Sequence, residues 1–362
     1  GHVEGWPQAR AAAGLARRYF LAGGAALAVA LGVLRWATGA TAVSAVPSAL
    51  GSAPSAAVLV AAGALLLAAM IQSALLPFHA WLLSSMTAPT PASALMHAGF
   101  VNAGGILLVR FAPVVSVDAS VLLAIVLVGA TSAILGKLLK TVRTDAKGKL
   151  GCSTVGQMGF MIMQAGLGFF GAAVTHLILQ GFYKAYQFLG AGGEVEHASP
   201  AATTTARSVT PLGVAVTAGT ALAGGAVFAT LTGKVSGVDT GLLLTLLVVL
   251  TGLHAAREVV VDASLPAAVR YGVVPLVTIP AIAVYAGVYN VISGLLTGLP
   301  AVGDPAELTA VHGLVAVAFL VAYGAVETGA YRHSQRLYVA LLNATQPAPE
   351  TQVTTTEEYN EY

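Results

Sequence analysis

Three polar side chains share one face of a predicted membrane helix near the middle of the chain. In the segment HLILQGFYKAYQFL, His176, Gln180 and Lys184 follow one another at intervals of four residues, which stacks them along one helix face. At the helical rise per residue, the three groups cover about 12 Å of the axis. An ionisable group at the bilayer centre costs about 2.5–3.5 kcal/mol on insertion scales, so its presence favours a function. The pattern predicts part of a proton pathway, with a snorkelling Lys184 as the alternative.

A second polar group precedes this helix in the chain. His97 lies in the segment TPASALMHAGFVNAGG, with Asn102 five residues later. A neutral imidazole can pass a proton between its two nitrogens; the alternative is a ring that is satisfied by a backbone carbonyl freed by the prolines. Gln72 is polar at membrane depth but can only orient water, because an amide carries no proton as a charge.

The remaining polar residues are weaker candidates. Lys137 is either a second buried amine or part of a basic cluster, and Lys234 ends an apolar run, where a proton exit group would be needed. Four ionisable residues lie near helix ends, where we expect structural pairing: His254, Glu258, His312 and Glu327. Three lie beyond a helix, where we expect a solvated surface: Glu194, Glu196 and His197.

The elements that carry these residues follow from composition. Only 9% of the 362 residues are charged and 57% are hydrophobic, whereas soluble domains are roughly 25% charged. This excludes a water-soluble enzyme and predicts an all-α, polytopic membrane bundle of about ten spans. The apolar runs cover residues 20–37, 55–75, 92–111, 119–140, 147–168, 170–193, 211–231, 239–257, 269–296 and 307–328.

Proline and glycine predict two broken helices. The broken-helix region includes Pro77, which ends the second run, and Pro89 and Pro91, which begin the third. Unwound backbone at membrane depth survives only where protein buries it or where it lines a wet cavity. The seventh run is loosened by Gly213, Gly219, Gly224 and Gly225. Two separated breaks are typical of transporters, although glycine and proline are also simply commoner in membrane helices.

Charge placement predicts the topology. If every run crosses once, most basic residues fall on one side, so the positive-inside rule puts both termini in the cytoplasm. Lys234 and Arg35 depart from this pattern. The chain begins with Gly1 and we expect it to lack its natural N-terminus; residues 1–19 form a polar cytoplasmic segment, and the tail 343–362 is expected to be disordered or bound to a partner. The same-side basic residues are Arg17, Arg18, Lys140, Arg143, Lys147, Lys149, Arg207, Arg257, Arg270, Arg332 and Arg336.

Several function classes are disfavoured by the sequence. A net charge of +2 gives no basic face for nucleic acid, and the single Cys152 excludes an intrachain disulfide or cysteine-ligated cluster. Residues 166–171 match GxGxxG, but they join two membrane helices rather than a strand and a helix, so we discount a dinucleotide site. We expect no cofactor or metal on this chain.

Three segments carry a resemblance to a known family. They are LPFHAWLLSSMTAPTPASALMHAGFVNAGGILLVR (76–110), TDAKGKLGCSTVGQMGFM (144–161) and THLILQGFYKAYQFLGAG (175–192). They resemble the proton-translocating antiporter-type subunits, which include subunit L of complex I, the large Mrp subunit and DabB, the membrane subunit of an inorganic-carbon pump. The resemblance covers about residues 55–235, and MHAGFVNAGG and the ending LYVALLNATQP are most similar to DabB.

The resemblance implies inverted five-helix repeats around a polar axis. Residues 20–111 would be the remainder of the first repeat, 119–257 the second, 269–328 extra helices and 329–362 a polar cytoplasmic tail. Lys184 matches the central channel lysine, His176 an accompanying histidine, His97 the histidine of the broken helix and Lys234 the exit lysine.

The sequence also departs from the family. Gln72 replaces a lysine, Gln180 replaces a second channel histidine, and Gly224 and Gly225 replace a proline break. The helices that carry the family's channel glutamate would precede residue 1.

The resulting expectation is a plasma-membrane subunit of an inorganic-carbon uptake complex. It would conduct protons or Na+ to drive a peripheral DabA-like partner that carries zinc. One alternative is a proton- or sodium-translocating subunit of a complex I-like oxidoreductase or an Mrp antiporter. A second is a non-conducting membrane anchor of such a complex.

Overall fold

The computed structural model describes residues 5–190, 210–234, 237–262 and 265–352. Within these ranges every regular element is helical, as predicted, and each of the ten apolar runs contains a helix. Glu194, Glu196 and His197 lie outside the described residues. The chain divides into two compact units: residues 1–195, 299–304 and 325–362 form the first, and residues 196–298 and 305–324 form the second.

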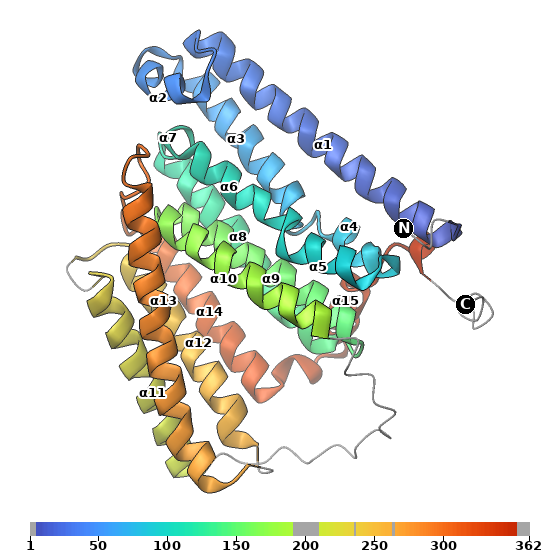
Figure 1. The fold of residues 1–362 in the computed structure, drawn as a ribbon, viewed down its shortest axis with the longest axis vertical. Helices are drawn as coiled ribbons and strands as arrows, with labels where there is room; N and C mark the ends of the chain where they lie inside the picture. Colours follow the sequence, from blue (N-terminus) through green and yellow to red (C-terminus); the bar gives the residue numbers. More distant parts are fainter. Residues whose placement is uncertain (1–4, 191–209, 235–236, 263–264, 353–362) are drawn as a thin grey trace. The chain divides into compact units, whose positions relative to one another are not determined.

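The first unit holds the helices that form or support the predicted polar site. They are α1 (Pro7–Thr38), α3 (Ser55–Gln72), α5 (Thr90–Ala98), α6 (Ala103–Arg110), α8 (Ala119–Val142), α9 (Ala146–Gly166) and α10 (Phe170–Gly190). Short helices connect or follow them: α2 (Val46–Ala49), α4 (Ala80–Leu83), α7 (Ala112–Val115) and α15 (Gln335–Ala344). Figure 1 shows α8, α9 and α10 running alongside one another.

The second unit is built around three helices, α11 (Pro211–Leu231), α12 (Gly241–Val261) and α13 (Val274–Leu296). A π-helical turn, Val269–Val273, leads into α13. The helix α14 (Ala310–Thr328) begins in this unit.

Eight helices of the described residues are long and apolar enough to cross a membrane. The helices α9 and α10 are not among these eight, although each has 21 residues, which is about 32 Å of helix and enough to span the hydrocarbon core. Polar and small residues lower their hydropathy, and these residues build the site described below.

Glycines allow α8 and α9 to pack backbone to backbone. A Cβ atom on Gly159 would lie 2.4 Å from the backbone nitrogen of Ala133, and one on Gly129 would lie 2.5 Å from that of Met163. Small residues at such crossings are what lets membrane helices approach closely. The pair therefore forms a rigid support for α10, which packs on α9.

The first helix begins earlier than expected. Residues 7–19, assigned to a polar segment, are the first turns of α1, a helix of 32 residues. At about 1.5 Å per residue this helix is about 48 Å long, more than the roughly 30 Å hydrocarbon core, so its polar start can extend beyond the lipid.

The first predicted break is observed: no α-helix covers the chain around Pro77, between the end of α3 at Gln72 and the start of α4 at Ala80, and Pro89 and Pro91 stand at the start of α5. A further interruption of the same span, which the sequence did not predict, lies at Gly99 and the 3₁₀ turn Phe100–Asn102.

The second predicted break is not observed. The helix α11 is continuous from Pro211 to Leu231. Two of its glycines serve packing, since a Cβ on Gly224 would meet Ile282 and one on Gly225 would lie 2.3 Å from Val249 Cγ2, whereas Gly219 has open space around it. In α11, Gly224 and Gly225 therefore mark close contacts and not a break.

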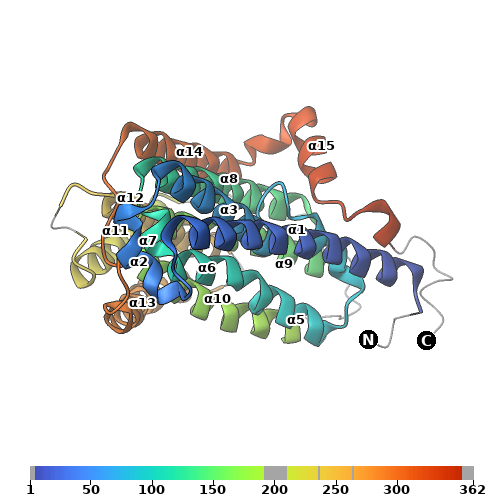
Figure 2. The ribbon, with the colours of Figure 1, turned by 90° about the horizontal axis from the view of Figure 1, so that it is seen from above.

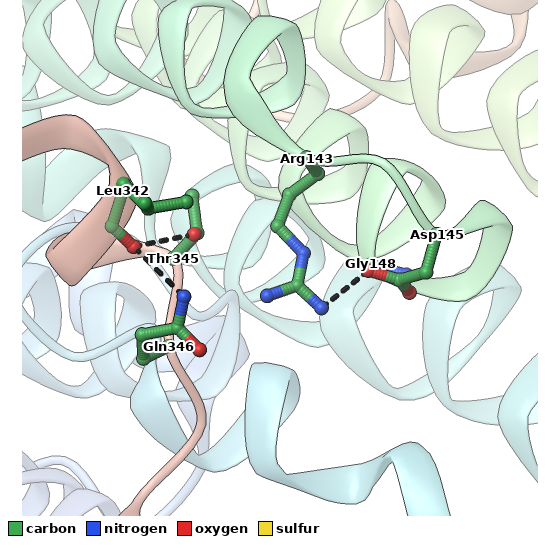
Figure 3. Close-up of polar contacts among 6 residues, drawn as sticks. All are labelled: Arg143, Asp145, Gly148, Leu342, Thr345 and Gln346. Carbon is green, nitrogen blue, oxygen red and sulfur yellow. Dashed lines mark hydrogen bonds and ion pairs between the residues drawn. The ribbon is translucent and has the colours of Figure 1, made fainter. Parts of the chain in front are cut away.

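The segment after α14 packs on the first unit, which corrects the expectation of a disordered or partner-bound tail for residues 343–352. Leu341 and Tyr331 join a buried cluster with Leu83, Val142 and Cys152. Figure 3 shows the end of α15, where Thr345 and Gln346 donate to the Leu342 carbonyl, together with the Arg143–Asp145 ion pair of the α8–α9 loop.

Two further hydrogen bonds tie this C-terminal segment to the chain that follows α3. His79 Nε2 lies 3.0 Å from the Ala344 carbonyl oxygen. The Ala348 N–H donates to Ser84 Oγ at 2.9 Å. We call residues 331–352 the C-terminal strap.

Candidate functional site: a buried polar site beside a helix break

The interruption between α5 and α6 is closed by side chains. Asn102 Nδ2 donates to the Ala98 carbonyl at 2.6 Å, and Gln72 Nε2 donates to the Phe100 carbonyl at 3.2 Å. Ser73 Oγ donates to the Val101 carbonyl at 2.6 Å. Carbonyls released from a helix ladder at membrane depth need such donors. Gln72, proposed for the proton pathway, is thus placed as a donor to the break.

The helix α10 lies directly against this break. A Cβ atom on Gly181 would lie 3.0 Å from the Ala98 carbonyl oxygen and 3.6 Å from Asn102 Nδ2. Figure 2 shows α5 and α6 following one another along α10. Glycine at this position lets the polar face of α10 approach the interrupted backbone.

Lys184 is buried in the protein, with 1% of its surface exposed. Its Nζ donates to Ser153 Oγ on α9 at 2.9 Å and to Gln187 Oε1, one turn along α10, at 3.3 Å. An isolated buried ammonium is costly, and two neutral acceptors only partly replace its hydration. The amine is therefore held inside the protein and does not snorkel to the surface.

His97 is fully buried beside the same two helices. Its Nδ1 lies 3.0 Å from Thr154 Oγ1 on α9, and its ring stacks on Phe188 of α10, with centroids 4.4 Å apart. Because Ser153 and Thr154 are neighbours, consecutive residues of α9 bind the two ionisable groups. The bond to Thr154, rather than one to a freed carbonyl, holds the ring.

The polar face of α10 continues with groups that lack a partner among the described residues. Both amide atoms of Gln180 and the Nε2 atom of His176 are buried and make no hydrogen bond to the described residues. The His176 ring lies 5.3 Å from that of Phe160 on α9. Buried polar atoms are normally satisfied by protein or ordered water, so this face has unused hydrogen-bonding capacity.

Sequence reasoning missed two residues of this site, both on α9: Ser153 and Thr154 contact the predicted ionisable groups. It also missed Gln164 of the same helix, which is 0% exposed with both amide atoms unpartnered among the described residues. An available signal was the low hydropathy of α9, where Ser153 contacts Lys184 of α10 and Thr154 contacts His97 of α5.

The other candidates lie elsewhere. Lys137 lies on α8 where this helix contacts α9, because a Cβ added to Gly156 of α9 would be 3.4 Å from the Lys137 backbone nitrogen. Lys234 follows α11 in the second unit, with Nζ 5.5 Å from the centroid of the Tyr289 ring. The structure thus brings together Lys184, His97 and the face of α10, and it places Gln72 at the adjoining break.

The pairing predicted for His254 is observed, since its Nε2 lies 3.0 Å from Glu258 Oε1. His312 has a local structural role, because its Nδ1 accepts the Thr309 N–H just before α14 at 3.1 Å. Glu327 lies in the last turn of α14. Within the described ranges no cluster of three or more His, Cys, Asp or Glu side chains could hold a metal ion.

Comparison with known proteins identifies relatives of this chain. The family model described as "NADH:quinone oxidoreductase/Mrp antiporter, TM" matches residues 1–216. A solved structure of the Mrp complex from Dietzia sp. contains a chain that is 26% identical. It aligns with a TM-score of 0.51 over 95% of this chain and 38% of that one.

The curated relatives include inorganic-carbon and respiratory subunits. The probable inorganic carbon transporter subunit DabB1 of Halothiobacillus neapolitanus is 49% identical over 36% of this chain and 24% of its own length. The DabB subunit of Bacillus subtilis is 48% identical over 36% and 26%. The NADH-quinone oxidoreductase subunit L of Mycobacterium tuberculosis is 44% identical over 40% and 23%.

The chain spans about a quarter of the length of these curated relatives. The family match nevertheless covers more than half of this chain and includes α1 to α10, which build the polar site. The chain belongs to the NADH:quinone oxidoreductase/Mrp antiporter membrane family.

Proposed function

We propose that this chain is part of the membrane subunit of an inorganic-carbon uptake complex. It conducts protons, or another cation, across the membrane through the site around Lys184. A peripheral DabA-like partner that carries zinc uses this flow to trap CO2 as bicarbonate. The subunit acts in the plasma membrane, with both ends of this chain on the cytoplasmic side.

The observation that carries the conduction step is the buried amine. Lys184 has two neutral acceptors, and neither its Ser153 nor its Gln187 contact is a carboxylate. An amine held by neutral groups in protein interior can exist in both protonation states, which a proton carrier requires. The identities with DabB subunits, at 43–49%, support inorganic carbon as the substrate of the assembly.

The second candidate is a proton- or sodium-translocating subunit of an Mrp antiporter or a complex I-like oxidoreductase. It is favoured by the structural match to a chain of an Mrp complex and by the subunit L relative. The same buried residues would serve it, so the partner and the ion distinguish the two.

A non-conducting membrane anchor is the third candidate. It is favoured by Gln72, which stands where the resemblance implies a lysine and whose amide donates to the Phe100 carbonyl. If Gln72 only satisfies the Phe100 carbonyl of the helix break, the chain lacks the proton-carrying amine at this position and one step of proton transfer is lost.

The test is uptake of labelled inorganic carbon in a host that lacks carbonic anhydrase. The full-length protein is expressed with the large soluble protein that copurifies with it from native membranes, and the zinc content of that protein is measured. Growth in air and uptake that depends on Lys184 would support the proposal. Copurification of oxidoreductase or Mrp subunits, with flat carbon uptake, would replace it with the second candidate. Full uptake with Lys184→Ala would favour the anchor.

A further inference from the structure

The hydrogen bonds around Thr154 bear on which nitrogen of His97 carries its proton. Thr154 Oγ1 lies 3.0 Å from His97 Nδ1 and 2.9 Å from the Leu150 carbonyl oxygen on its own helix. Both side chains are fully buried. A threonine hydroxyl has one hydrogen to donate, and a neutral imidazole has one N–H and one bare nitrogen.

Two arrangements of hydrogens are compatible with these distances. In the first, the His97 Nδ1–H donates to Thr154, and the Thr154 hydroxyl donates to the Leu150 carbonyl, so every donor has an acceptor. In the second, the hydroxyl donates to a bare Nδ1, and the hydrogen of His97 is on Nε2. Nε2 is buried and has no hydrogen-bond partner among the described residues in either arrangement, so the second arrangement makes one hydrogen bond where the first makes two.

Because Nε2 is unpartnered in both arrangements, the additional hydrogen bond of the first one decides between the two. We infer that Thr154 is a positioning residue that holds neutral His97 as its Nδ1–H tautomer and makes Nε2 the proton-accepting atom. The stack on Phe188 fixes the plane of the ring. No redox or covalent step is involved: Nε2 gains a proton to give the imidazolium and loses the same proton to restore the neutral ring.

This inference changes the role of His97 within the proposed function, on which its consequence for transport rests. A histidine that relays a proton accepts a proton at one ring nitrogen and releases a proton from the other. Here Nδ1–H remains bonded to Thr154 in both charge states, so protons enter and leave through Nε2. His97 then stores a proton beside the path instead of relaying it from one nitrogen to the other.

The tautomer can be measured without any transport. In full-length protein labelled with 15N-histidine, the signal of His97 is assigned by its loss in His97→Gln. It is then recorded at alkaline pH, where the ring is neutral. We expect a protonated Nδ1 and a bare Nε2 in the wild type. A proton on Nε2 in the wild type would overturn the inference.

Two variants test Thr154 itself. Thr154→Val removes the acceptor and should move the His97 hydrogen to Nε2 or to a mixture, whereas Thr154→Ser should keep it on Nδ1. The matched control is Thr175→Val, because Thr175 is also fully buried and also donates to the carbonyl four residues before it, that of Gly171. An unchanged Nδ1–H signal in Thr154→Val would show that Thr154 does not select the tautomer.

Transport provides a separate readout. Thr154→Val should lower the rate several-fold, with recovery in Thr154→Ser and no change in Thr175→Val. A full rate in Thr154→Val despite a changed tautomer would refute the storage role. If the wild type conducts nothing, the proposed function fails while the tautomer result stands by itself. If Thr154→Val does not fold, the wild-type and Thr154→Ser spectra still decide the assignment.

Discussion

The amine of Lys184 lies 2.9 Å from the hydroxyl of Ser153, and the next residue, Thr154, bonds His97. One turn of α9 therefore binds the ionisable side chains of two different helices. Any movement of α9 along its axis would move both contacts together.

Replacement of Lys184 tests whether proton exchange, and not charge alone, is required. Lys184→Ala should reduce proton flux to the background of empty vesicles. Lys184→Arg should do the same, because a guanidinium stays protonated. Flux is measured with a pH-sensitive dye in vesicles that contain the full complex. Lys149→Ala, an exposed lysine of α9, is the control; a conducting Lys184→Arg variant would contradict the exchange role.

Removal of the Ser73 hydroxyl should loosen the helix break. Ser73→Ala leaves the buried Val101 carbonyl without its donor, which costs about 1–3 kcal/mol. We expect faster hydrogen exchange at the amides that follow Gly99. Ser48→Ala removes an equivalent bond to the Ala45 carbonyl in an exposed turn and should leave this exchange unchanged. Equal exchange in the two variants would argue against the role of Ser73.

A methyl group at Gly159 should disrupt the α8–α9 contact. The added Cβ would lie 2.4 Å from the Ala133 backbone nitrogen, and such overpacking destabilises by about 1–3 kcal/mol. Gly63 of α3 has open space around it, so Gly63→Ala should stabilise its helix by about 0.5–1 kcal/mol. Thermal unfolding in one detergent compares the two. A Gly159→Ala protein as stable as the wild type would show that the helices can separate without cost.

Shortening Leu341 should release the C-terminal strap. Leu341 is buried in the cluster with Leu83 and Val142, so Leu341→Ala removes one of the two strap residues, with Tyr331, that this cluster holds. Limited proteolysis should then cleave within residues 332–352 at lower protease concentration. Leu337→Ala, one turn earlier on the exposed side of α15, should cleave like the wild type. Identical patterns for both variants would mean that Leu341 does not anchor the strap.

The helices were predictable because apolar runs long enough to cross lipid can be read from the sequence, although α9 and α10 are less apolar than the eight clear spans. All ten apolar runs contain helices, and the face shared by His176, Gln180 and Lys184 follows from helical spacing. The buried state of Lys184 was also expected from its place within a run.

The helix break and the contacts across helices were not predictable in the same way. Pro89 and Pro91 stand at the start of α5 as predicted, because proline is well suited to the first turn of a helix, but the sequence did not indicate the further interruption at Gly99. Gly99 gave no stronger signal than Gly224, and only tertiary packing distinguishes them. Ser153 and Thr154 read as ordinary small polar residues, since their role depends on which helix lies opposite.

The bonds that the C-terminal strap makes to His79 and Ser84 join residues 265 and 264 positions apart. During synthesis the segment after α3 leaves the ribosome long before its partners exist. Its final packing must wait until the strap has been made and has returned to it. Membrane insertion can therefore be complete before the C-terminal strap has packed against the segment after α3. A chain truncated before residue 331 would keep its membrane spans but could not form these contacts.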